Sequence, residues 1–218
     1  MLTTLVGTGL FLALMAGLFL PLEGWFARER WAPGRREVAL CVGLLFADVM
    51  LMEAVGGPLL DGLRAAMPES AAPTAIRVVI VLVLAELAGY WIHRAMHRNR
   101  WLWRLHALHH APRRLHWLVA WRQHPIDFLL HGIAVGLPGA LLDASLADLT
   151  AVVLLRKTYT TFLHANLRWR LAWLEPWIAT PAIHRVHHSA DPRDYDRNFA
   201  GMLPLLDQAF GTYARPRD

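Results

Sequence analysis

Long apolar segments restrict what this chain can fold into. Three of them run from about residue 2 to 21, from 38 to 55 and from 75 to 92. A helix of roughly 20 apolar residues is long enough to cross the hydrocarbon core of a bilayer. Charged residues make up only 18% of the 218 residues, against roughly 25% in a typical soluble domain. We therefore predict an all-α integral membrane protein, whose first segment is retained as a helix rather than cleaved as a signal peptide.

A further apolar region, from about residue 126 to 163, contains a polar turn. We interpret it as a helical hairpin that enters the membrane and returns. Each arm is marginally long, so the sequence leaves open whether the hairpin crosses the bilayer fully. No repeat or second domain is visible. We predict a single membrane-embedded domain, residues 1–218, in which 1–75 form a transmembrane anchor with its loops and 76–218 form a histidine-rich catalytic region.

Basic residues indicate the orientation in the membrane. Four arginines lie between the first two apolar segments, and Arg94, Arg98 and Arg100 follow the third. Because Lys and Arg concentrate in cytoplasmic loops, we expect both of these ends on the cytoplasmic side. The net charge of +5 is typical of a chain whose basic cytoplasmic loops face anionic lipid. The arginine-rich stretches match no nucleic-acid-binding motif, and we expect no nucleic-acid partner.

Histidines are clustered at the ends of these apolar segments. Residues at i, i+3 and i+4 share one face of a helix, so each cluster presents its imidazoles together. The clusters are His93 with His97, His106 with His109 and His110, and His184 with His187 and His188.

Two single histidines, His124 and His164, stand between the clusters, whereas His116 and His131 belong to no cluster and their participation stays open. One metal takes about four to six ligands, so ten converging imidazoles predict two metals. Cys41 is the only cysteine, which excludes an intrachain disulfide and a cysteine-based metal site. Nitrogen ligands suit iron and oxygen chemistry, without excluding zinc, copper or manganese.

Two classes of function fit a histidine-rich metal centre at a membrane surface. One is a redox enzyme that acts on a lipid, and the other is a membrane metal-binding or metal-transport protein without redox catalysis. A transporter would place ionisable ligands deep along a path through the membrane. Here the histidines are expected at one face, beside arginine and tryptophan, and this favours the enzyme.

These motifs resemble those of the fatty acid hydroxylase / sterol desaturase superfamily of membrane di-iron enzymes. The resemblance begins near Glu86 and extends almost to the C-terminus. It is carried by His93-Arg-Ala-Met-His97, Trp103-Arg-Leu-His106-Ala-Leu-His109-His110, Arg122-Gln-His124-Pro125, Phe162-Leu-His164-Ala-Asn166 and Thr180-Pro-Ala-Ile-His184-Arg-Val-His187-His188-Ser189. Asn198-Phe199 and Phe210-Gly211-Thr212-Tyr213 resemble the closing signature of bacterial members.

The resemblance implies about four transmembrane helices, the last two as a hairpin, with a cytosolic helical cap that holds the metals. It implies two iron ions, for which zinc can substitute in a purified sample. The implied reaction uses dioxygen and two electrons to hydroxylate or desaturate an unactivated C–H bond of a lipid. Sterol-like, hopanoid, carotenoid and fatty acyl substrates all stay open, as does the product type.

The resemblance also implies a location and partners. We expect a multi-pass protein of the bacterial inner membrane with its metal site on the cytoplasmic side. Because no haem domain is visible, we expect electrons from a separate donor of the ferredoxin or cytochrome type. The oligomeric state cannot be predicted from the sequence.

By this resemblance the family's metal ligands carry over to ten histidines: His93, His97, His106, His109, His110, His124, His164, His184, His187 and His188. Metal-bound histidines usually donate their other N–H to a carboxylate or a carbonyl. Five nearby polar residues are hypothesised to orient imidazoles in this way: Glu86, Asp127, Asp191, Asp194 and Asn198.

Overall fold

The computed structural model describes residues 1–70 and 72–217, apart from the side chains of residues 146–148. This described part is mainly helical, and it contains no β-strand beyond one isolated bridge between Ala27 and Leu167. The helices are α1 (Leu2–Phe26), α2 (Arg35–Leu51), α3 (Gly57–Ala65), α4 (Thr74–Arg98), α5 (Arg100–His110), α6 (Pro125–Leu141), α7 (Leu146–His164), α8 (Pro181–His187) and α9 (Leu205–Ala209). Short irregular turns of helix are η1 (Met52–Gly56), η2 (Trp117–Trp121) and η3 (Pro192–Asp194).

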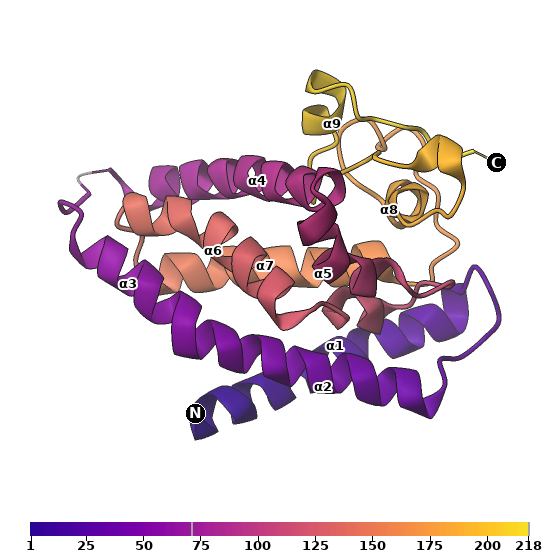
Figure 1. The fold of residues 1–218 in the computed structure, drawn as a ribbon, viewed down its shortest axis with the longest axis horizontal. Helices are drawn as coiled ribbons and strands as arrows, with labels where there is room; N and C mark the ends of the chain where they lie inside the picture. The colour runs from indigo at the N-terminus through magenta and orange to yellow at the C-terminus, as the bar shows by residue number, and fades with distance from the viewer. Residues whose placement is uncertain (71, 218) are drawn as a thin grey trace.

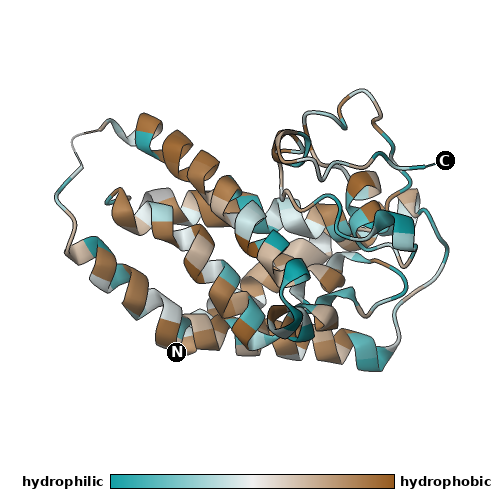
Figure 2. Cartoon of the chain, turned by 45° about the horizontal axis from the view of Figure 1, so that its top comes forward, coloured by the Kyte–Doolittle hydropathy of each residue, from teal (hydrophilic) through white to brown (hydrophobic). Residues whose placement is uncertain are grey.

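Within the described part of the chain, three helical runs are long and apolar enough to cross a membrane: α1, the run Arg35–Ala65, and α4. Their outward faces carry exposed leucine, valine and isoleucine side chains. The ribbon of these helices is largely brown, the colour of hydrophobic residues, in Figure 2. A soluble protein would bury so continuous an apolar surface, whereas lipid covers it in a membrane. The prediction of an all-α membrane protein is therefore confirmed.

The second of these runs is longer than the sequence indicated. The apolar segment was expected to end at about residue 55, but the helical path continues through η1 and α3 to Ala65. The π-type turn makes this continuation feasible, since the Gly57 N–H bonds back to the carbonyl of Met52. Pro58 lies in the first turn of α3, directly after the π-type turn, where the regular i→i−4 hydrogen-bond pattern is already interrupted.

Helices α6 and α7 form the predicted hairpin and lie between α4 and the α2–α3 run (Figure 1). Two glycines of α6 let it approach that run closely. A Cβ on Gly132 would lie 3.0 Å from the sulfur of Met52, and one on Gly136 would collide with Leu60. The α6 helix is apolar but shorter than the three candidate membrane spans.

The histidine-bearing helices meet at one end of this bundle, where α4 ends and α5 and α8 lie close by (Figure 1). Asn99 starts α5, because its side chain accepts hydrogen bonds from the N–H groups of Trp101 and Leu102. A carboxylate of α1, Glu23, accepts the backbone N–H groups of Trp117 and Asn166, each at 2.8 Å. These bonds fix η2 and the end of α7 on the first membrane helix.

Candidate metal centre

Nine of the ten predicted ligands converge into two groups. In each group one ring nitrogen per residue lies within 4.8 Å of the others. The first histidine group consists of His93, His97, His106, His110 and His187. The second histidine group consists of His109, His164, His184 and His188.

Each HxxHH motif contributes histidines to both groups. In α5, His106 and His110 stand one turn apart in the first group, while His109 turns to the second. The second HxxHH motif, at α8, divides the other way. His187 joins the first group, and His184 and His188 join the second. The imidazoles of His110 and His188 stack with their centroids 4.2 Å apart, so the two groups adjoin.

The ring nitrogens of these groups are arranged as a metal would require. In the first group all five Nε2 atoms are buried and have no hydrogen-bond partner among the described residues. In the second group Nε2 of His164 lies 3.0 Å from Nε2 of both His109 and His184. Buried nitrogens left unpaired destabilise a protein unless something binds them. Bound cations would satisfy these atoms, and the residues therefore fit two metal ions.

Oxygen acceptors hold several of the imidazoles in place from behind. Nδ1 of His93 donates to the carbonyl of Phe199, and Nδ1 of His187 donates to that of Arg197, both at 2.8 Å. Nδ1 of His164 donates to a carbonyl of its own helix. A carbonyl can only accept, so each of these rings carries its proton on Nδ1 and leaves Nε2 free as a ligand.

Asp127 is the one hypothesised orienting residue that contacts a clustered histidine directly. Its carboxylate accepts from Nδ1 of His106 at 2.9 Å, and the side chain is fully buried. The sequence related Asp127 to its near neighbour His124, whereas the fold pairs it with a residue on another helix. A buried carboxylate behind a ligand fixes the ring and raises its basicity.

Asn198 contacts no histidine through its side chain, but its backbone lies between the two carbonyls that do. Its φ of 56° is in the left-handed region, which Asn tolerates better than most residues. Its side chain is tied to the carbonyls of Ile183 and Ala214. The resulting bend directs the carbonyls of Arg197 and Phe199 toward the first histidine group.

The other three hypothesised orienting residues do not contact the clustered histidines. Glu86 pairs with Arg156, while Asp191 and Asp194 pair with arginines of the C-terminal segment. Sequence reasoning also missed Asp207, which accepts the N–H groups of Phe199 and Ala200 and so fixes the loop behind His93. No spacing in the sequence connects Asp207 to the histidines.

His124 is the predicted ligand that the structure does not bring to either group. Its Nδ1 accepts the backbone N–H of Ile126 at 3.2 Å, so the ring caps the start of α6. His116 lies 3.5 Å from a carboxylate oxygen of Glu37, away from both groups. His131 packs beside His93, with 6.3 Å between ring centroids, but joins neither group.

Replacing His124 by alanine is expected to leave the metal content unchanged. The variant should lose about 1 kcal/mol of unfolding free energy, because one N-terminal N–H of α6 loses its acceptor. Metal analysis and thermal unfolding of the purified variant measure both effects. His124→Asn, which can cap a helix, is the matched control and should restore the stability. Loss of metal from both variants would instead identify His124 as a ligand.

Burial keeps five of the clustered histidines in the neutral form. It lowers the pKa of His109, His110, His184, His187 and His188 well below the ordinary value of 6.5, and neighbouring imidazoles lower it further. Neutral imidazole is the form that binds metals.

The stability of the metal-free protein should therefore fall as the pH drops below about 6.5. In that range the unfolded chain binds protons that the folded chain excludes, so unfolding is favoured at lower pH. Each histidine that stays neutral in the folded protein lowers the unfolding free energy by about 1.4 kcal/mol for every pH unit below this value. Thermal midpoints of the chelator-treated protein, measured in detergent between about pH 8 and pH 5, test this. A midpoint that stays constant across the range would contradict it.

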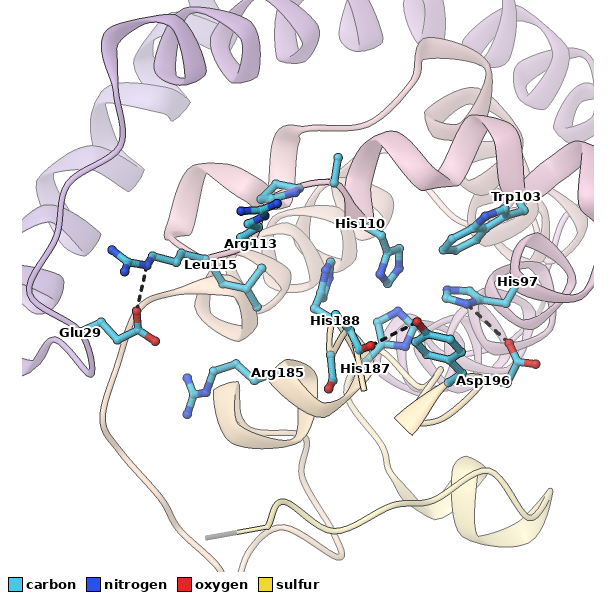
Figure 3. A pocket seen from close by; sticks show the side chains of 16 residues that line it. Glu29, His97, Trp103, His110, Arg113, Leu115, Arg185, His187, His188 and Asp196 are labelled. Carbon is cyan, nitrogen blue, oxygen red and sulfur yellow. Dashed lines mark hydrogen bonds and ion pairs between the residues drawn. The ribbon is translucent and has the colours of Figure 1, made fainter. Parts of the chain in front are cut away.

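A cavity of about 830 Å³ gives access to both groups. His97, His110 and His187 of the first group and His188 of the second border it. Figure 3 shows these rings with Trp103 on one side of the cavity, and Arg113 and Arg185 on the other. A small molecule in this cavity would therefore lie against both metal positions.

Comparison with known proteins gives several related sequences. The ornithine lipid hydroxylase OlsE of Rhizobium tropici is 34% identical over 184 residues, which cover 84% of this chain and 54% of that protein. The alkylglycerol monooxygenase of Danio rerio is 31% identical over 133 residues, or 61% of this chain and 29% of that protein. The human alkylglycerol monooxygenase is 28% identical, covering 59% of this chain and 28% of that protein. This chain thus spans about half or less of the length of these relatives.

No solved structure matches the chain. The family model for fatty acid hydroxylases matches residues 78–212, a region that contains all nine clustered histidines. This match and the relatives confirm the resemblance that the histidine motifs indicated. The chain belongs to the fatty acid hydroxylase family.

Proposed function

We propose that the chain is a membrane di-iron oxygenase that hydroxylates or desaturates an unactivated C–H bond of a lipid, using dioxygen and electrons from a separate protein. The observation that carries this proposal is the pair of adjoining histidine groups at the end of three apolar helices. Nine imidazoles in two sets provide ligands for two metals, and a shared cavity reaches both. The named relatives are hydroxylases and monooxygenases.

Each histidine group would hold one iron through the ring nitrogens that face its centre. Bound iron supplies the redox chemistry of dioxygen that side chains alone lack. The chain's own residues orient the ligands, exclude water and position the substrate. Asp127 and the carbonyls of Arg197 and Phe199 orient the imidazoles, and burial of most of the rings excludes bulk water. The cavity beside the rings positions the substrate.

We further propose a substrate drawn from the membrane, at the cytoplasmic face of a bacterial inner membrane. The exposed apolar helices and the basic loops next to the histidines support this location. Two of the named relatives act on ornithine lipid or alkylglycerol, which both carry a polar head on an apolar body. A polar lipid fits a cavity with rings and arginines on opposite sides better than a pure hydrocarbon.

Metal analysis and isotope labelling test this function together. The protein is purified without oxygen, its metals are counted, and a Mössbauer spectrum is recorded. We expect two exchange-coupled irons per chain, one for each histidine group. Expressing cells grown under oxygen-18 should contain a hydroxylated lipid with the label, or a desaturated one without it, absent from cells without the gene. A chain that holds zinc and changes no lipid in an iron-replete host would favour a metal-binding or transport protein.

A further inference from the structure

The cavity beside the histidine groups has a strongly basic side. Arg113, Arg114 and Arg185 line it, and Figure 3 shows Arg113 and Arg185 on the side opposite the rings. Two carboxylates also border the cavity, Glu29 and Asp196. The arginines do not belong to either histidine group, and their role depends on which of these charges are already paired within the protein.

Ion pairs within the protein account for only part of this charge. Nε of Arg114 lies 3.2 Å from a carboxylate oxygen of Glu29, and Arg98 lies 3.5 Å from Asp196. Arg113 and Arg185 form no ion pair with any described residue. Two guanidinium groups therefore remain available on the wall of the cavity.

Arg185 is held in place but not fully satisfied. It is partly buried, and its Nη1 donates to the carbonyl of Leu167 at 3.1 Å. Its Nε is buried and has no hydrogen-bond partner among the described residues. A buried N–H donor on a cation without an acceptor is costly unless a ligand accepts from it. Arg113 is exposed and free to turn toward the same ligand.

We propose that Arg113 and Arg185 bind the anionic headgroup of a membrane lipid, and that the cavity thereby presents carbons close to this headgroup to the histidine groups. The proposal rests on the function proposed above. A planar guanidinium binds a carboxylate or a phosphate through parallel charge-assisted hydrogen bonds, and two such groups give orientation as well as affinity. A lipid entering tail first would instead lay methylene groups against charged side chains, which lose their hydration without compensation.

The position of the cavity favours a lipid over a soluble anion. Glu29, on its edge, lies in the loop between the end of α1 at Phe26 and the start of α2 at Arg35. Both helices are candidate membrane spans, so this edge stands at the level of the lipid headgroups. Basic side chains at this level attract anionic lipids.

Binding of two lipids that differ in one charge tests the proposal. The full chain is reconstituted in phosphatidylcholine nanodiscs, and radiolabelled N-palmitoylglycine is compared with neutral N-palmitoylglycinamide by scintillation proximity. We expect the carboxylate to bind at least about tenfold more tightly than the amide. The double variant Arg113→Gln and Arg185→Gln should bind both probes equally weakly. Arg100→Gln, an exposed arginine of α5 that does not line the cavity, is the matched control and should behave like the wild type.

Two further measurements separate the alternatives. N-acetylglycine and inorganic phosphate are tested as competitors, and a soluble anion that displaces the lipid at equal concentration would overturn the assignment to a headgroup. Metal content of each variant shows whether the fold is intact, and Arg185→Lys, which keeps the charge, should retain part of the preference. Equal binding of the two probes by an iron-loaded wild type that still modifies lipid overturns this inference while the proposed function stands. A wild type that modifies no lipid but still prefers the carboxylate overturns the proposed function alone.

Discussion

Replacing His184 by alanine is expected to remove one metal from the protein and to abolish turnover. His184 belongs to the second histidine group, which has four members, so the variant retains three imidazoles at that position. Three ligands bind a metal much more weakly than four in a buried site whose remaining nitrogens cannot rearrange. The metal content should fall from two per chain, one for each group, to about one. Turnover should fall by at least about a thousandfold, because the proposed oxidation needs both metals.

A variant in the first histidine group tests whether metal loss depends on the number of ligands in a group. His187→Ala reduces the first histidine group from five members to four, so more of its metal should be retained than in His184→Ala. Val186→Ala, a buried position between them on α8, is the matched control for the packing of that helix and should keep both metals. Plasma emission spectrometry and lipid turnover measure the series. Equal metal loss in His184→Ala and His187→Ala would contradict the division into groups of four and five.

Local periodicity made much of this site predictable. The apolar lengths of 2–21, 38–55 and 75–92 indicated the membrane helices, and the spacing of the histidines in α4, α5 and α8 indicated three faces of imidazoles. Both features depend only on neighbours within one helix. The division of each HxxHH motif between two metal positions follows from how the helices pack, which the spacing alone does not contain.

The remaining features depend on contacts between distant residues or on the backbone. The carbonyls of Arg197 and Phe199 have no sequence signature, since every residue has one. His124 was predicted as a ligand from the family resemblance, but the structure brings it to neither histidine group, and its Nδ1 caps α6. Glu86 was hypothesised to orient an imidazole, whereas its partner in the structure is Arg156, 70 residues away.

A second large effect, on stability, is expected when Glu86 is replaced. Glu86 is 2% exposed, forms an ion pair with Arg156 of α7, and accepts the N–H of Met202 at 2.8 Å. This one carboxylate therefore connects α4, α7 and the C-terminal segment that carries Phe199. Removing one member of a buried ion pair leaves the other charge without compensation, which typically costs about 3–5 kcal/mol. Glu86→Leu should lower the unfolding free energy by about that amount.

A compensating variant distinguishes a structural role for this carboxylate from a role in orienting ligands. Glu86→Leu combined with Arg156→Met removes both charges, and it should recover most of the lost stability, apart from about 1 kcal/mol for the N–H of Met202. Unfolding in mixed micelles, followed by circular dichroism, measures both variants, and metal analysis at low temperature accompanies it. If Glu86→Leu loses metal while its stability is unchanged, the carboxylate acts on the imidazoles as the sequence suggested. If stability falls in the single variant and returns in the double variant with metal retained, Glu86 serves to compensate the charge of Arg156 between α4 and α7, and it is not needed to orient the imidazoles.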